Sequence, residues 1–290
     1  MDQEKITPTT HRSYDSLMMG LNTGLSLLGG AAVGILVYEL LRKKKSQHRE
    51  SLTPLVDNIT VSENGTVSKL MTFGWDDDEV CSWARELSLG PDGRVISEKL
   101  VEIEYAPEHI LIAESNGEED TTPVLSTVLL DEYGMAKAFS RRSRSGKEVR
   151  WDGTIIGAEL KELTSEETTA VFDWVDGNIR TISFNGAVGQ RMTYYKSIEN
   201  HLFPDLNMIA LGITSDLPLT HILGTRTRHF LSTLEIVKGE EIYHYAFSYL
   251  FDSEDRPMQI HEELVVLDVT GKELSGGPTH RDYDIKYLTK

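Results

Sequence analysis

The stretch Tyr243-His-Tyr-Ala-Phe-Ser-Tyr-Leu-Phe251 alternates five aromatic residues with four others. Because successive side chains of a β-strand point to opposite faces, this spacing places all five rings on one face of a strand. Turn residues follow at 252–257, and Met258-Gln-Ile260 begins a returning strand. The stretch therefore predicts an antiparallel hairpin with one packed face.

Similar strand and turn units recur from residue 58 to residue 290. The clearest predicted strands are Val101–Tyr105, Val171–Val175, Ile179–Phe184, Ser232–Val237 and Asp284–Leu288. Pairs such as Asp176-Gly177 and Asn185-Gly186 suit two-residue hairpins, since both central residues must adopt positive φ. We predict a mainly β fold: an up-and-down antiparallel meander that forms a soluble barrel or a strongly curled sheet.

Charged or hydroxylated residues occupy alternate positions of most predicted strands, as Glu102 and Glu104 do between Val101, Ile103 and Tyr105. A barrel that spans a membrane needs an outward apolar band on every strand. The pattern therefore favours a barrel whose second face meets water.

A helix-like spacing of Leu206, Ile209, Ala210 and Ile213 interrupts the β pattern. Pro204 and Asp205 come just before it, where they suit a helix start. We predict a short helical insertion near 201–224.

The first 57 residues divide into a polar N-terminus at 1–16, a predicted transmembrane helix at 17–41 and a basic juxtamembrane linker at 42–57. No charged residue occurs from Leu17 to Tyr38, a run that makes roughly 33 Å of helix, enough for a hydrocarbon core of about 30 Å. The chain should therefore contact the lipid bilayer through residues 17–41. Small residues at four-residue spacing let helices approach closely in lipid, so a helix-association face is predicted at Gly20, Gly24, Gly30 and Gly34.

Several motifs appear together in the second half of the β region. They are Asp205-Leu-Asn207, Leu223-Gly-Thr-Arg226, the Tyr-rich strand, Phe251-Asp-Ser-Glu-Asp-Arg256 and Val175-Asp-Gly-Asn-Ile-Arg180. Their order and spacing resemble a Bacteroidota family of exported domains with a porin-like fold, domain of unknown function 4595, over roughly residues 58–290. The resemblance implies an up-and-down antiparallel barrel. It implies no catalytic or binding residues, because that family has no assigned activity.

The side of the membrane on which the β domain lies is open. Arg42-Lys-Lys-Lys45 follows the predicted single membrane span, and the positive-inside rule then places the β domain in the cytoplasm. The resemblance implies an exported domain instead.

Composition excludes several classes of function. The formal charge of −17 disfavours nucleic acid as a partner, because phosphate backbones are bound by clustered Lys and Arg. A single cysteine, Cys81, excludes an intrachain disulfide and should be a small buried hydrophobe. The histidines lack metalloprotease spacing, although His201, His221 and His229 bracket the insertion and could converge. No catalytic motif and no cofactor fingerprint occurs, so we expect neither an enzyme nor a bound cofactor.

The function that these features favour is a membrane-anchored, barrel-like domain that binds a ligand or a protein partner. Its aromatic inner face would either pack solid or enclose an apolar ligand, and the candidate ligand-facing side chains are Tyr243, Tyr245, Phe247 and Tyr249. One alternative is a structural or assembly subunit of a membrane complex or homo-oligomer, associated through the glycine-stepped helix. A second is a hydrolase that acts on surface polysaccharide with paired carboxylates.

Overall fold

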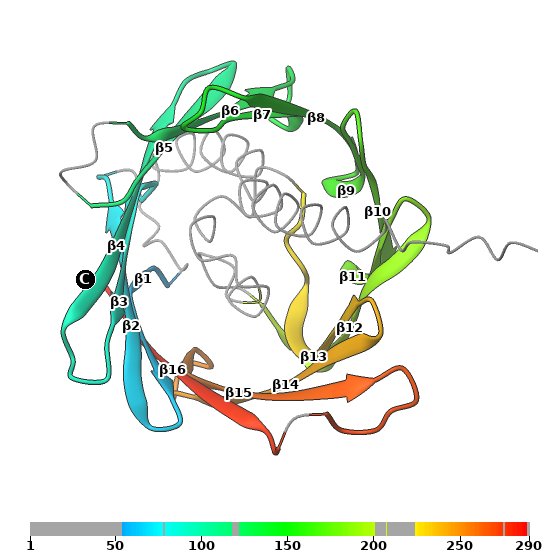
Figure 1. Ribbon diagram of the computed structural model, residues 1–290. Coiled ribbons are helices and arrows are strands. Elements are labelled where there is room, and N and C mark those ends of the chain that lie inside the picture. Colours follow the sequence, from blue (N-terminus) through cyan, green and yellow to red (C-terminus); the bar gives the residue numbers. More distant parts are fainter. Residues whose placement is uncertain are drawn as a thin grey trace, which may run out of the picture.

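The computed structural model describes residues 54–77, 79–117, 122–200, 207, 224–274 and 276–288. In these ranges the chain forms one closed antiparallel barrel (Figure 1), in which each strand pairs with its neighbours in sequence and β1 pairs with β16. The strands are β1 (Val56–Glu63), β2 (Thr66–Trp75), β3 (Cys81–Leu89), β4 (Val95–Tyr105), β5 (His109–Ser115), β6 (Val124–Leu130), β7 (Ala136–Arg142), β8 (Glu148–Ile156), β9 (Glu159–Thr164), β10 (Thr169–Val175), β11 (Asn178–Phe184), β12 (Ala187–Glu199), β13 (His229–Lys238), β14 (Glu241–Phe251), β15 (Pro257–Asp268) and β16 (Thr279–Tyr287). The prediction of a mainly β up-and-down meander is confirmed, and the sheet closes.

The hairpin turns lie where the sequence places them. Asp176 and Gly177 have φ values of 54° and 75°, and Asn185 and Gly186 have values of 49° and 85°. Both pairs therefore adopt the positive φ that a two-residue hairpin requires. The predicted aromatic strand lies within β14, which pairs with β15 as the returning strand.

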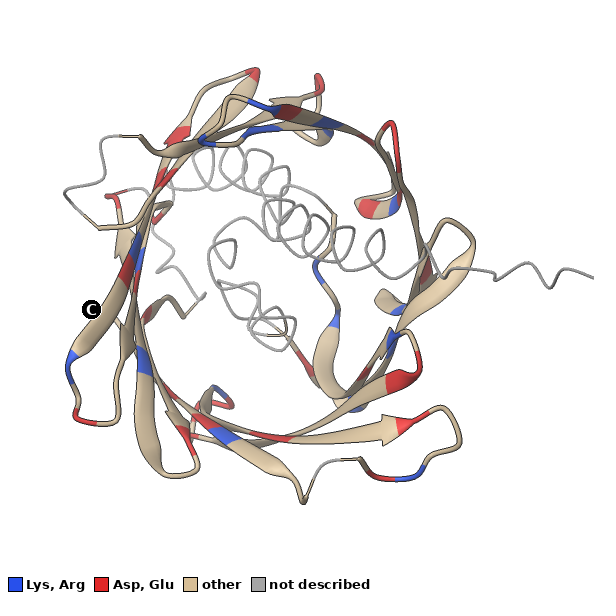
Figure 2. Ribbon diagram, viewed as in Figure 1, with Lys and Arg blue, Asp and Glu red and all other residues tan. Residues whose placement is uncertain are grey.

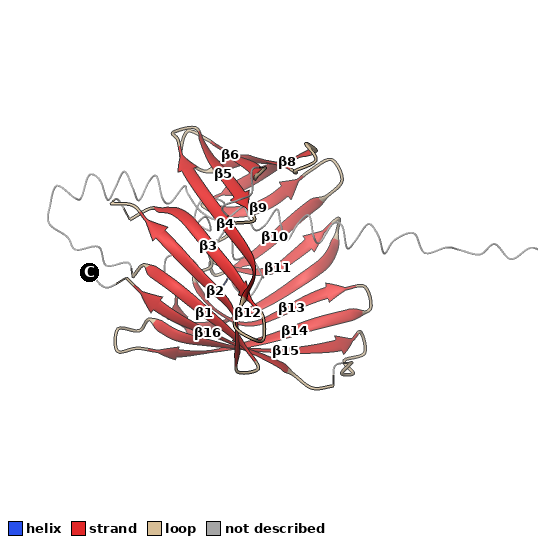
Figure 3. Cartoon of the chain, turned by 60° about the vertical axis from the view of Figure 1, so that its left-hand side comes forward, coloured by secondary structure: helices blue, strands red, loops and turns tan. Residues whose placement is uncertain are grey.

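The barrel closes through the two ends of the β region. Val56 of β1 is in register with Tyr287 of β16, and Glu63 with Arg281. Beyond the ladder, the Leu288 N–H donates to the Leu55 carbonyl over 2.9 Å. Closure leaves no free sheet edge among the described strands, and Figure 3 shows the strands tilted across the barrel. β1 begins two residues before residue 58, where the sequence predicts the β domain to start.

One face of the sheet is buried and apolar all round the barrel. Side chains from every strand contribute to this inner face, among them the fully buried Phe139, Ile110 and Leu163. Cys81 is also fully buried, and this burial raises the pKa of its thiol to about 12. The prediction that Cys81 is a small buried hydrophobe is confirmed.

The opposite face carries charged side chains that pair across neighbouring strands. Examples are Arg85 with Glu98 at 2.5 Å, Arg180 with Asp173 at 2.6 Å and Arg191 with Glu235 at 3.5 Å. Figure 2 shows charged positions on strands and turns around the whole barrel. An Arg or Lys side chain on a lipid-facing barrel wall costs about 2–4 kcal/mol near the bilayer midplane. The outer face of the described strands therefore suits water rather than lipid.

Two predicted elements fall outside the described residues. These are the helix at 17–41, with Gly20, Gly24, Gly30 and Gly34, and the helical insertion near 201–224 apart from Asn207 and Gly224. In the part of the chain that the structure describes, no helix is long and apolar enough to cross a membrane.

Candidate functional site

The predicted ligand-facing aromatics lie on the inner face of β14. Phe247 is buried in the core, and Tyr243, Tyr245 and Tyr249 pack against that core. The Tyr249 hydroxyl donates to the Leu231 carbonyl over 2.8 Å, so its polar end is bound within the wall. All four side chains pack in the β13–β15 wall, and Tyr243 and Tyr249 also donate hydrogen bonds there.

The motifs that carry the family resemblance hold β13 in place. The Asn207 amide donates to the His229 carbonyl over 2.8 Å, and its oxygen accepts from the Leu231 N–H over 2.9 Å. The β12–β13 register shifts between Tyr194 and Glu199, next to these backbone groups. The side chain of Asn207 therefore makes the pair of hydrogen bonds that a strand residue would make.

Gly224 and Arg226 fix the segment that leads into β13. The Gly224 carbonyl accepts from the Leu160 N–H over 2.8 Å. A Cβ at Gly224, whose φ is +62°, would lie 2.7 Å from the Ala158 carbonyl oxygen, so only glycine fits there. Arg226 donates to the Asn200 carbonyl over 2.8 Å.

His229 is the one member of the predicted histidine group that the structure describes. It is buried, and its Nδ1 lies 2.9 Å from the Asn178 amide nitrogen. Because that amide can only donate, Nδ1 is the acceptor and the ring proton of a neutral His229 is on Nε2. No set of three or more His, Cys, Asp or Glu side chains suited to a metal ion occurs in the described ranges.

A row of charged side chains, the inner charge belt, follows the apolar core on the inner face of eight strands. Each member lies two residues from a core residue on its own strand, and the sign alternates along the barrel wall: Glu262 (β15), Arg281 (β16), Glu63 (β1), Lys69 (β2), Glu86 (β3), Lys99 (β4), Glu114 (β5) and Arg141 (β7). The belt lies toward the barrel end that holds the β1–β2, β3–β4 and β5–β6 turns.

Glu114 forms ion pairs with two cations of the belt. Its two oxygens lie 2.7 Å from the Lys99 ammonium and 2.9 Å from an Arg141 guanidinium nitrogen. Its side chain is only 6% exposed. A buried carboxylate is stable only with such partners, because removing it from water is costly.

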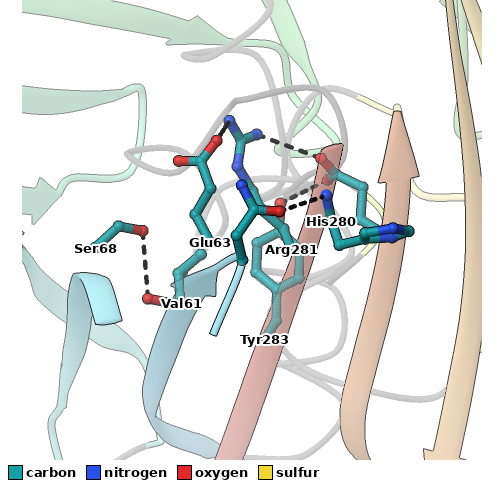
Figure 4. A network of polar contacts seen from close by, with 8 residues as sticks. Val61, Glu63, Ser68, His280, Arg281 and Tyr283 are labelled. Atoms are coloured by element: carbon teal, nitrogen blue, oxygen red, sulfur yellow. Dashed lines mark hydrogen bonds and ion pairs between the residues drawn. The ribbon is translucent and has the colours of Figure 1, made fainter. Parts of the chain in front are cut away.

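Glu262 forms the second centre of the belt, and its neighbours Glu63, Arg281 and Tyr283 are labelled in Figure 4. Its carboxylate accepts a hydrogen bond from the Tyr283 hydroxyl at 2.6 Å and another from Arg281 at 3.3 Å, and Arg281 also reaches Glu63 at 3.4 Å. Burial raises the pKa of Glu262, and the bonds from Tyr283 and Arg281 oppose that rise. The belt thus consists of charges whose partners lie within the protein.

A groove of about 640 Å³ opens at the other end of the barrel. This groove, called the rim groove below, lies between the β4–β5 turn and the β6–β7 turn. It is lined by Pro107, Glu108, His109, Leu129, Leu130, Asp131, Glu132, Tyr133, Gly134 and Lys137. Ligand pockets in proteins measure about 300–1,000 Å³, so the rim groove falls within that range.

Hydrogen bonds from backbone N–H groups hold both turns of the rim groove. The Asp131 carboxylate accepts the Tyr133 N–H over 2.9 Å and the Met135 N–H over 2.8 Å. The Glu108 carbonyl accepts the Leu130 N–H over 2.8 Å, which joins the β4–β5 turn to β6. The groove is therefore preformed.

Apart from Asp131, the polar side chains that line the rim groove have no partners among the described residues. Within the described residues, Glu108, His109, Glu132, Tyr133 and Lys137 form no side-chain hydrogen bond or ion pair. Tyr133 is 65% exposed. The sequence marked 131–134 as a turn and gave no sign of a binding site, because 107–109 and 129–137 meet only through the β4–β5–β6–β7 register.

Comparison with one solved structure supports the fold. A crystal structure of a porin-like protein from Bacteroides uniformis is similar over 81% of this chain and 98% of its own, with 15% identity and a TM-score of 0.57. A porin-like protein from Bacteroides vulgatus matches over 82% of this chain and 100% of its own, with 11% identity and a TM-score of 0.29. No family model and no curated protein matches the chain. The chain thus shares a porin-like barrel fold, while its relation to the domain of unknown function 4595 family remains a resemblance.

Proposed function

We propose that the barrel is a non-enzymatic binding domain and that its ligand or partner occupies the rim groove. The observation that supports this proposal is the set of five polar side chains in the groove that have no partner in the described chain. Parts of the outer wall pair their charges across strands, as Arg85 and Glu98 do. Polar groups placed around a preformed groove without internal bonds are available to a ligand.

The proposal places the domain beside a membrane. Residues 17–41 would anchor it as a single-pass helix, since Leu17–Tyr38 is uncharged and long enough to span a bilayer. The glycine steps in that helix would serve association with a second copy or with a membrane complex.

Binding explains the rim groove better than hydrolysis does. A glycosidase needs two facing carboxyl groups, one of them kept protonated by burial. Asp131 already accepts two backbone N–H groups, and Glu108 and Glu132 are exposed. Glu262, whose pKa is raised, lies on the inner face of β15 and is bonded to Tyr283 and Arg281.

A fragment screen tests the proposal. Ligand-detected NMR with the full chain in detergent should find small polar fragments that bind the wild type, with signals that are lost in the double variant Glu108→Ala, Lys137→Ala. Both side chains lack partners among the described residues, so the variant should keep its fold. Fragments that bind wild type and variant equally would show that the site lies elsewhere.

A further inference from the structure

We infer that the rim groove binds a neutral carbohydrate, an inference that rests on the proposed binding function. The groove offers three kinds of surface together: an exposed aromatic ring, apolar side chains, and both hydrogen-bond donors and acceptors. A sugar presents the matching surfaces, since its ring has an apolar C–H face and a rim of hydroxyl groups.

The aromatic surface is Tyr133. It occupies the β6–β7 turn, 65% exposed, and its backbone N–H is bonded to the Asp131 carboxylate. An exposed aromatic ring on a tight, hydrogen-bonded turn loses little conformational freedom when a ligand stacks on it. Leu129 and Pro107 provide apolar surface in the same groove.

The polar side chains of the groove include both hydrogen-bond acceptors and hydrogen-bond donors. Glu108 and Glu132 accept hydrogen bonds, Lys137 donates them, and His109 can do either. A hydroxyl group both donates and accepts, so one sugar hydroxyl can bond a carboxylate and the ammonium at the same time. A basic peptide would gain from the carboxylates but would be repelled by Lys137.

The test uses the full chain in detergent against an array of neutral and uronic-acid oligosaccharides, followed by calorimetry with the strongest neutral binder. We expect Tyr133→Ala to lower the affinity at least tenfold and Tyr133→Phe to stay within threefold of wild type, since the ring remains. Leu250→Ala, another exposed apolar side chain, lies on β14 outside the groove and should leave binding unchanged.

Lys137→Gln distinguishes a carbohydrate ligand from a basic peptide, because it should change the two affinities in opposite directions. It should weaken oligosaccharide binding severalfold, because a charged donor is lost, and it should strengthen any binding of a lysine hexapeptide. The carbohydrate assignment is overturned if no neutral oligosaccharide binds or if Tyr133→Ala leaves their affinity unchanged. In that case, fragment binding that still depends on Glu108 and Lys137 would support the proposed binding function with a different ligand. If no fragment bound in this way, both the binding function and the carbohydrate assignment would be overturned.

Discussion

The inner charge belt and the rim groove both hold carboxylates and cations, and they differ in where those charges find partners. In the belt, Glu114 and Glu262 are almost completely buried. Glu114 forms ion pairs with two cations, and Glu262 accepts hydrogen bonds from two side chains. In the groove, Glu108, Glu132 and Lys137 are exposed and have no partner among the described residues. Charge inside the barrel is thus satisfied by the fold, whereas charge at the rim is left to solvent or a ligand.

This difference predicts opposite responses to mutation. Removing one partner of a buried pair leaves an uncompensated charge inside the protein. Removing an exposed, unbonded side chain changes little in the folded state.

The largest expected effect is at Glu114. Glu114→Gln leaves Lys99 and Arg141 without their shared carboxylate, and should lower the free energy of unfolding by about 3 kcal/mol. Urea denaturation measures the change. Arg180→Gln, which breaks the exposed pair with Asp173, is the control and should cost no more than about 1 kcal/mol. Equal losses in the two variants would mean that the belt is no more important than the outer pairs.

A smaller effect, with a pH dependence, is expected at Tyr283. Tyr283→Phe removes the hydroxyl that donates to Glu262, and should cost about 1–2 kcal/mol at neutral pH. The variant and the wild type should be compared by denaturation across the acidic range.

The sign of that dependence follows from the raised pKa of Glu262. Because the folded protein holds this proton more tightly than the unfolded chain does, the stabilising contribution of the protonated form is complete below the ordinary pKa of 4.5. It is lost as pH rises through the folded value. Without the Tyr283 hydroxyl the folded pKa rises further, so the difference between the proteins should shrink as pH falls. A difference that does not vary with pH would exclude Glu262 as its source.

The smallest effects are expected in the rim groove. Glu108→Ala and Lys137→Ala should each change the free energy of unfolding by less than about 0.5 kcal/mol, because neither side chain is bonded within the described chain. The same urea titrations provide the measurement. A loss comparable with that of Tyr283→Phe would show that the groove side chains have a structural role, and the contrast with the belt would fail.

Much of the barrel's strand and turn structure could be predicted, because side-chain alternation and turn residues are local features of the sequence. The alternation in Tyr243–Phe251 identified the inward face of β14, and Asp176-Gly177 and Asn185-Gly186 identified tight turns. The candidate site was harder to predict. The alternating aromatic residues of β14 led to the prediction of a ligand-facing surface there. The rim groove depends on two short turns whose sequences carry no binding motif.

What the sequence determined by itself was the antiparallel meander, the burial of Cys81 and the separation of an apolar face from a polar one, because side-chain period and turn chemistry act between near neighbours. Only the tertiary structure decided that β1 closes on β16, that Asn207 bonds to the backbone of β13, and that acids and bases alternate along the inner wall. These features depend on register between strands that are distant in the chain, and a one-residue shift would send every side chain to the other face. The same dependence explains why the rim groove, and with it the proposed function, became visible only in the closed barrel.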